Sequence, residues 1–129
     1  MATEIFTNPI TLLLDKRSGT LNVPIGSWTT VGEINATQAA GTYEFWISLT
    51  LTQSNNNDTA LVQFSGNGGS TWNTFNWKSN SANQTEAAVY GYPLIHAGGV
   101  FHGMLQVQAD TGTTQLDVDF SDIWLKRIN

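Results

Sequence analysis

Apolar and polar residues alternate along residues 41–52, which read Gly-Thr-Tyr-Glu-Phe-Trp-Ile-Ser-Leu-Thr-Leu-Thr. One parity of this segment is apolar throughout and holds Tyr43, Phe45, Ile47, Leu49 and Leu51. The other parity is polar except for Trp46. Because successive side chains of a strand point to opposite faces of a sheet, the pattern predicts a long β-strand with one face in the core.

Shorter segments of the same kind follow one another along the chain, separated by turn residues. We predict strands at residues 10–14, 20–24, 28–34, 59–65, 72–77, 87–93, 100–109 and 115–128. Asn-Gly-Gly at residues 67–69 is a strong hairpin signal, because Asn and Gly accept positive φ angles. We expect a charged turn at residues 15–19, and residues 35–40 are nearest to a helix but too short for a stable one. Frequent turns without a long helical pattern predict an all-β sandwich or barrel.

Composition and charge exclude several classes of function. A chain of 129 residues without cysteine is expected to form one domain with no disulfide framework, thiol nucleophile or zinc–thiolate site. Charged residues make up only 12%, so Thr, Asn, Ser and Gly supply the polar surface. With a net charge of −5 and five Lys and Arg residues, the chain has no basic stripe, so we expect no nucleic-acid partner.

The first residues, Met-Ala-Thr-Glu-Ile-Phe, lack a basic stretch followed by an apolar run. We therefore expect no secretory signal, and synthesis and folding in a cytosol. Residues 11–14, Thr-Leu-Leu-Leu, are too short to cross a bilayer, so we expect no membrane partner.

Two histidines are the first candidates for chemistry. His96 and His102 lie on either side of residues 97–101, but no third metal ligand lies at a spacing that is typical of metal sites. A Ser–His–Asp triad is disfavoured because no nucleophile-elbow sequence is present. We expect hydrogen-bonded surface or interface histidines.

Acidic residues gather near the C-terminal end. Asp117, Asp119 and Asp122 could offer oxygens to Ca²⁺, but the sequence has no loop to complete such a site, and a solvated strand face is the simpler interpretation. A pair of glycosidase carboxylates is also conceivable, with Glu44 or Glu86 as further candidates, but nothing in the sequence selects a pair. We predict no enzyme, no metal and no cofactor.

The segment Ser65-Gly-Asn67-Gly-Gly69-Ser-Thr71-Trp72 resembles an Asp-box, with Asn67 where Asp is usual. In the families that carry it, this motif is a self-stabilised hairpin turn with the Trp packed beneath. It recurs in sialidases and in sugar-handling or virion proteins, usually away from catalytic residues. The resemblance implies a structural role.

The chain has five tryptophans, Trp28, Trp46, Trp72, Trp77 and Trp124. Some are expected in the core, and others are available for a sugar-stacking platform or a subunit interface, where aromatic residues are enriched. Trp46 lies on the polar parity of its strand. It is an interface or ligand candidate if that face is exposed, and a structural residue if both sheet faces are covered.

Three segments, in order, resemble the C1q/TNF-like jelly-roll domains. Residues 41–45 look like the Gly-x-Tyr-x-Phe strand of that family. Residues 98–105 look like its Gly-Asp-x-Val strand, with Gly99 in place of Asp and Phe101 in place of Val. Residues 119–125 look like its closing Phe-Ser-x-φ-x-Leu strand. The resemblance covers about residues 20–128 and implies an antiparallel jelly-roll β-sandwich that forms a homotrimer.

An acidic, cysteine-free jelly roll without a collagen-like stalk is similar to small virion proteins of tailed phages. Those proteins coat capsids as decoration or cement proteins, or tip fibres. The resemblance implies a non-enzymatic virion protein on the outer capsid surface, with the major capsid protein as partner. The alternative is a carbohydrate-binding or receptor-binding module of a phage fibre or tail tip.

These hypotheses assign residues to roles. Residues 1–18 are expected to be an N-terminal arm or first strand, and residues 19–129 the jelly-roll domain. Capsid or subunit contacts are assigned to Ile5, Phe6, Ile10, Leu12, Leu14 and Trp46. For surface glycans, stacking is assigned to Trp72, Trp77 and Tyr92, with Trp46 as a further stacking candidate, and hydrogen bonding is assigned to Asn76 and Asn80.

Overall fold

The computed structural model describes residues 10–53, 57–78, 85–112 and 114–129. These residues form nine β-strands and no helix. The strands are β1 (Ile10–Arg17), β2 (Leu21–Val23), β3 (Thr29–Gln38), β4 (Gly41–Gln53), β5 (Thr59–Ser65), β6 (Asn73–Lys78), β7 (Thr85–His96), β8 (Gly99–Thr111) and β9 (Thr114–Arg127).

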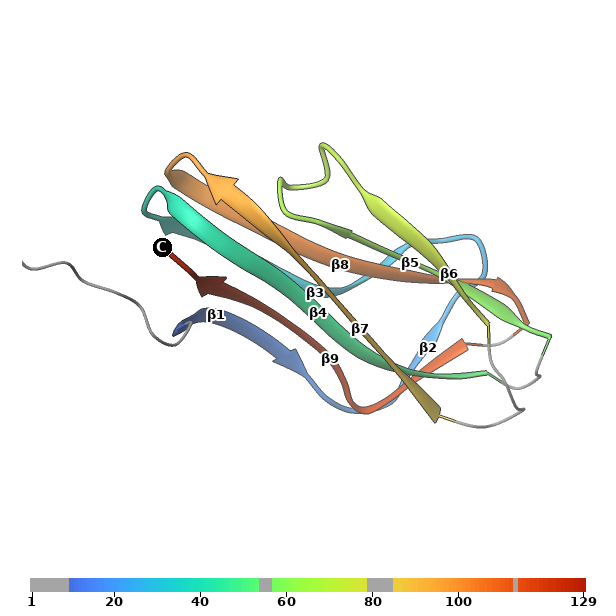
Figure 1. Cartoon of the computed structure of the whole chain (residues 1–129). Coiled ribbons are helices and arrows are strands. Elements are labelled where there is room, and N and C mark those ends of the chain that lie inside the picture. The colour runs from blue at the N-terminus through green and yellow to red at the C-terminus, as the bar shows by residue number, and fades with distance from the viewer. Residues whose placement is uncertain (1–9, 54–56, 79–84, 113) are drawn as a thin grey trace, which may run out of the picture.

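The strands form two sheets that pack face to face (Figure 1). The first sheet has the order β1-β9-β4-β7, with β2 beside the start of β9, and the second has the order β3-β8-β5-β6. Every strand pair is antiparallel, and most join strands that are distant in the sequence. The predicted all-β, antiparallel jelly-roll sandwich is confirmed.

The core lies between the sheets and is built on the alternation of β4. The five apolar side chains of its inner parity are at most 1% exposed: Tyr43, Phe45, Ile47, Leu49 and Leu51. They face apolar residues of the second sheet, and the rings of Phe45 and Phe101 meet nearly edge to face with centroids 5.6 Å apart. Burying each large apolar side chain contributes roughly 1.5–3 kcal/mol, so this cluster is the main source of stability.

Three boundaries differ from those that the sequence predicts. Residues 15–17 continue β1 instead of forming a turn, and Lys16 stands opposite Asp122 of β9. Residues 35–38 continue β3 along β8, where Ala36 is paired with Phe101. β7 runs on to His96. In each case a long-range partner strand decides the conformation, which local propensity cannot do.

Charged side chains close one long side of the sandwich, between the edge strands β1 and β3. The Asp15 carboxylate accepts hydrogen bonds from the backbone N–H of Glu33 at 2.8 Å and from Arg17 Nε at 3.1 Å. Arg17 also donates to the carbonyl of Thr30 at 3.3 Å. These bonds occupy backbone groups that an edge strand would otherwise expose.

The opposite long side lies between β6 and β7, and it is filled by aromatic rings. Phe75 of β6 stacks on Tyr90 of β7 with centroids 5.8 Å apart, and Phe64 lies 5.2 Å from the same tyrosine ring. No backbone pairing joins the two strands in the described ranges. This side therefore leaves room for a hollow at one end.

Candidate functional site

Two tryptophans stack on the outer face of the first sheet. Trp46 of β4 and Trp124 of β9 are direct cross-strand partners, with ring centroids 6.1 Å apart and planes 6° from parallel. Both side chains are half-buried. Trp46 Nε1 donates to Glu44 at 3.4 Å, and Lys126 Nζ lies 6.0 Å from the Trp124 ring centroid. The pair is therefore held in one orientation.

Gly91 of β7 makes this arrangement possible. β4 lies between β9 and β7, and Gly91 is the cross-strand partner of Trp46 on β7. A Cβ atom added to Gly91 would lie 2.3 Å from the indole ring of Trp46. Such a contact is far below van der Waals distance, so the ring rests directly on the glycine backbone. Trp46 thus lies across β7, β4 and β9 at the centre of the sheet.

Exposed apolar side chains continue this surface along β7. Val89 is 59% exposed and stands opposite Ser48, while Ile95 is 86% exposed and stands opposite Thr42. Directly opposed residues share a sheet face. We call the surface formed by Trp46, Trp124, Gly91, Val89 and Ile95 the Trp46 face. Its centre is a half-exposed aromatic pair, which answers the question that the sequence left open about Trp46.

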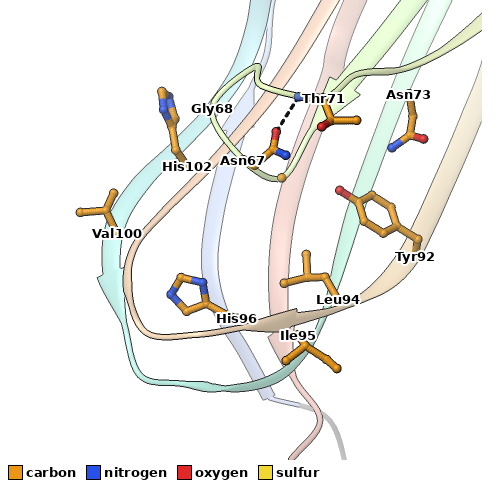
Figure 2. A pocket seen from close by; sticks show the side chains of 11 residues that line it. Asn67, Gly68, Thr71, Asn73, Tyr92, Leu94, Ile95, His96, Val100 and His102 are labelled. Atoms are coloured by element: carbon orange, nitrogen blue, oxygen red, sulfur yellow. Dashed lines mark hydrogen bonds between the residues drawn. The ribbon is translucent and has the colours of Figure 1, made fainter.

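A cleft of about 760 Å³ lies at the end of the sandwich where the β5–β6 and β7–β8 turns approach each other (Figure 2). It is lined by Gly66, Asn67, Gly68, Thr71, Asn73, Tyr92, Leu94, Ile95, His96, Val100 and His102. The lining combines amide, hydroxyl and imidazole groups with aliphatic side chains. No lysine, arginine or carboxylate is among these residues.

The Asp-box-like segment forms one wall and folds as the motif predicts. Asn67 Oδ1 accepts hydrogen bonds from the Thr71 N–H at 2.9 Å, drawn dashed in Figure 2, and from the Ser65 hydroxyl at 2.7 Å. The Gly69 N–H donates to Ser65 Oγ at 2.9 Å. Gly68, at φ 69°, donates its N–H to the carbonyl of His102 at 2.8 Å. The turn is therefore rigid and fixed to β8.

Tyr92 forms the floor where β7 passes beneath the hairpin. Its ring packs against Phe64 and Phe45, with centroids 5.7 and 6.0 Å away, and the hydroxyl reaches the backbone of Gly66. Burial raises the pKa of the Tyr92 phenol above its ordinary value, and the hydrogen bond with Gly66 opposes this rise. The cleft therefore carries a neutral hydroxyl at neutral pH.

Two histidines line the cleft, His96 at the end of β7 and His102 on β8. His96 Nε2 lies 3.1 Å from the carbonyl of Gly99, which can only accept, so Nε2 donates and a neutral ring keeps Nδ1 as an acceptor. His102 Nε2 lies 3.0 Å from a carboxylate oxygen of Glu33. As expected, both are hydrogen-bonded residues, although they belong to a shared cleft that the sequence did not predict.

The structure separates the three predicted stacking residues. Tyr92 lines the cleft, whereas Trp72 packs over Gly69 beneath the hairpin turn, where an added Cβ would lie 3.0 Å from its ring. Trp77 packs against the core cluster. Asn76 is exposed on β6, and Asn80 lies outside the described residues. Asn73, which the sequence did not single out, and Thr71 of the Asp-box-like segment line the cleft instead.

Of the predicted contact residues, Ile5 and Phe6 lie outside the described residues. Residues 10–17 are β1, whose backbone pairs with β9, with Leu14 opposite Trp124. Ile10 and Leu12 belong to the same strand, and their proposed contact role stays a prediction.

Asp117, Asp119 and Asp122 lie on β9, and Glu86 lies on β7. In the described ranges, no group of three or more His, Cys, Asp or Glu residues could hold a metal ion. The same part of the chain contains no helix that could span a membrane.

Neither protein-family models nor curated proteins match this sequence. Among solved structures, the chain is similar to the TNF protein Eiger from S. frugiperda, with a TM-score of 0.58 and 12% identity over 95% of this chain and 94% of that one. At this identity the likeness establishes the jelly-roll fold alone.

Two further similar structures are carbohydrate-binding modules. One is the module CBM6cm-2 of Cellvibrio mixtus lichenase 5A in complex with cellotriose, with a TM-score of 0.45 and 14% identity over 93% of this chain and 91% of that one. The other is the C-terminal CBM6 of LamC, a laminarinase from Zobellia galactanivorans, with a TM-score of 0.44 and 12% identity over the same shares.

Proposed function

We propose that this chain is a non-catalytic structural protein of a virion, which decorates the outer surface of a capsid and has the major capsid protein as its partner. Its action is contact between rigid surfaces, without a chemical step. The sandwich supplies a stiff body, because its core is closed and one long side is fixed by the Asp15 hydrogen bonds.

The stacked Trp46–Trp124 pair is the observation that carries this proposal. Tryptophan is enriched at the centres of protein interfaces, where large flat rings bury much area at little cost in side-chain entropy. Here two rings lie parallel and half-exposed, with Val89 and Ile95 adding exposed apolar surface beside them. A glycine beneath Trp46 keeps this surface flat.

We assign the Trp46 face to contact between copies of this chain, in a homotrimer. In a closed ring of three copies each contact joins two different patches, so the Trp46 face of one copy packs against another surface of its neighbour. Opposite charges are already present at the rim of this face. Glu44 and Lys126 are direct cross-strand partners beside the tryptophan pair. Repetition of such a unit over a capsid multiplies weak contacts by avidity.

Light scattering on the purified protein tests this assignment. The expected particle has three times the chain mass of 14.1 kDa, and Trp46→Ala should shift it to the mass of one chain. Trp28→Ala is the matched control, because Trp28 is 36% exposed but lies outside the Trp46 face. A wild-type protein that stays at one chain mass at all concentrations would contradict the assignment.

Capsid binding needs a separate measurement. We expect the protein to co-sediment with heads of the phage that encodes it, and to lose this binding when residues 1–9 are deleted. This deletion leaves β1 intact, so it tests the proposed arm without removing any of the nine described strands. Unchanged co-sedimentation would contradict the role of Ile5 and Phe6.

A further inference from the structure

We infer that the cleft between the β5–β6 and β7–β8 turns is a binding site for a neutral saccharide of one or two sugar units. This function goes beyond virion assembly and does not rest on it, because the tryptophan pair lies on the outer face of β7 and Tyr92 lines the cleft from its inner side. Ile95, near the end of β7, is the one named residue that the cleft shares with the Trp46 face. Even-numbered residues such as Tyr92 point inward, whereas Gly91 lies on the outer face under Trp46.

The size and walls of the cleft suit a small amphipathic ligand. Its volume of about 760 Å³ falls within the range of about 300–1,000 Å³ that is usual for small-molecule sites. Leu94, Ile95 and Val100 supply aliphatic walls, and Figure 2 shows Leu94 and Ile95 below Thr71 and Asn73, with Val100 at the left beside His102. A sugar ring has apolar C–H faces and a polar rim, which matches walls of both kinds.

The available hydrogen-bonding groups both donate and accept. The amide of Asn73 has no hydrogen-bond partner among the described residues, and it offers two N–H donors and a carbonyl acceptor. In its neutral form the His96 ring offers Nδ1 as an acceptor, because Nε2 donates to the carbonyl of Gly99. Each sugar hydroxyl can act as donor and acceptor, so one ligand class satisfies this whole set.

Other ligand classes fit the lining less well. A phosphate or sulfate needs cationic donors, but no Lys or Arg is among the described residues that line the cleft, and His102 is already paired with Glu33. A metal ion needs a cluster of ligands that the described residues do not form. A fatty chain would bury the amide of Asn73 without a partner, at a cost in binding free energy.

Two of the polar side chains, those of Asn67 and His96, are held in place before any ligand arrives. The Asn67 side chain is fixed by Ser65 and Thr71, and the turn is bonded to His102 through the Gly68 N–H. The ring of His96 packs between Tyr43 and Phe101, with both centroids 6.0 Å away. Such preorganisation lowers the entropy cost of binding.

Amide chemical shifts, measured during titration with maltose, cellobiose, lactose and N,N′-diacetylchitobiose, test the inference. At least one of these probes should shift the side-chain amide of Asn73 and the backbone amides of residues 66–68. Asn73→Ala should lower the affinity for that probe about fivefold, which corresponds to the loss of one hydrogen bond. Asn76→Ala is the matched control, because Asn76 lies on the same strand but does not line the cleft.

A second variant fills the cleft without removing a polar group. Val100→Phe places a ring at a position that is 62% exposed, so folding is expected to persist, and all saccharide shifts should vanish. The inference is overturned if no neutral probe shifts these amides, or if Asn73→Ala and Asn76→Ala weaken binding equally. The mass of the particle is measured separately from saccharide binding. A failed titration therefore leaves the assembly proposal standing, and a monomeric mass leaves the saccharide site standing.

Discussion

An aromatic side chain contacts a glycine on each face of β7, but the two contacts differ in geometry. On the outer face, the indole of Trp46 lies on Gly91, and an added Cβ would meet three ring atoms at 2.3–2.7 Å. On the inner side, only the hydroxyl of Tyr92 approaches Gly66, where an added Cβ would lie 2.7 Å from this oxygen. The first glycine supports a whole ring, whereas the second accommodates its tip.

The difference separates a surface from a hollow. A ring that lies flat on a backbone makes a plane, and a plane suits another macromolecule. A ring that stands in the core and presents only its hydroxyl leaves space above it, which suits a small solute. The same strand can therefore serve two partners, because neighbouring residues point to opposite sides of the sheet.

Gly91→Ala should give the largest effect, because the whole indole of Trp46 would have to move. We expect the free energy of unfolding to fall by about 1–3 kcal/mol, the usual cost of overpacking, measured by urea denaturation. The proposed trimer should dissociate at the same time. In a Trp46→Ala background the clash is absent, so Gly91→Ala should then cost little, and an equal cost in both backgrounds would contradict this contact.

The alternation in β4 made the fold predictable. In any β-sandwich, alternate residues of a strand face the core, so the local sequence alone shows the pattern. Tyr43 and Phe45 were assigned to the core from spacing alone, and both are fully buried. The extent of β3 was not predictable, since residues 35–38 have weak strand propensity and owe their conformation to pairing with β8. Strand boundaries follow from a partner that the local sequence does not contain.

The candidate site depended even more on register. Trp46 was noticed because it breaks the polar parity, but nothing local indicates that Trp124 and Gly91 flank it on neighbouring strands. The cleft needs the β5–β6 turn to lie beside β7 and β8, which places Asn73 and His96 in the lining of one cleft. No sequence motif indicates that these two turns lie side by side. The sequence therefore pointed to Trp72 and Trp77, which do not line the cleft.

Gly66→Ala should give a smaller loss than Gly91→Ala. Only the tip of Tyr92 must shift, so we expect a loss of less than about 1 kcal/mol in the free energy of unfolding. Removing the hydroxyl removes the obstacle, and Gly66→Ala should therefore be nearly neutral when it is combined with Tyr92→Phe. A double-mutant cycle in urea measures this coupling, and strict additivity would show that the hydroxyl is not what the added methyl meets.

The smallest expected effect is a change in stability at alkaline pH. Burial raises the pKa of Tyr92 in the folded chain above the ordinary value of 10.0, so the folded state binds the phenolic proton more tightly than the unfolded state does. The contribution of this proton is complete below the unfolded pKa and is lost as the pH rises through the folded pKa.

Wild type should therefore lose stability above about pH 10, and Tyr92→Phe, which has no proton to lose there, should lose less over the same interval. Urea midpoints at pH 8 and at several higher pH values, compared between the two proteins, measure the difference. Parallel curves would mean that the phenol of Tyr92 is solvated. The inner side of β7 would then lack the buried floor that distinguishes it from the Trp46 face.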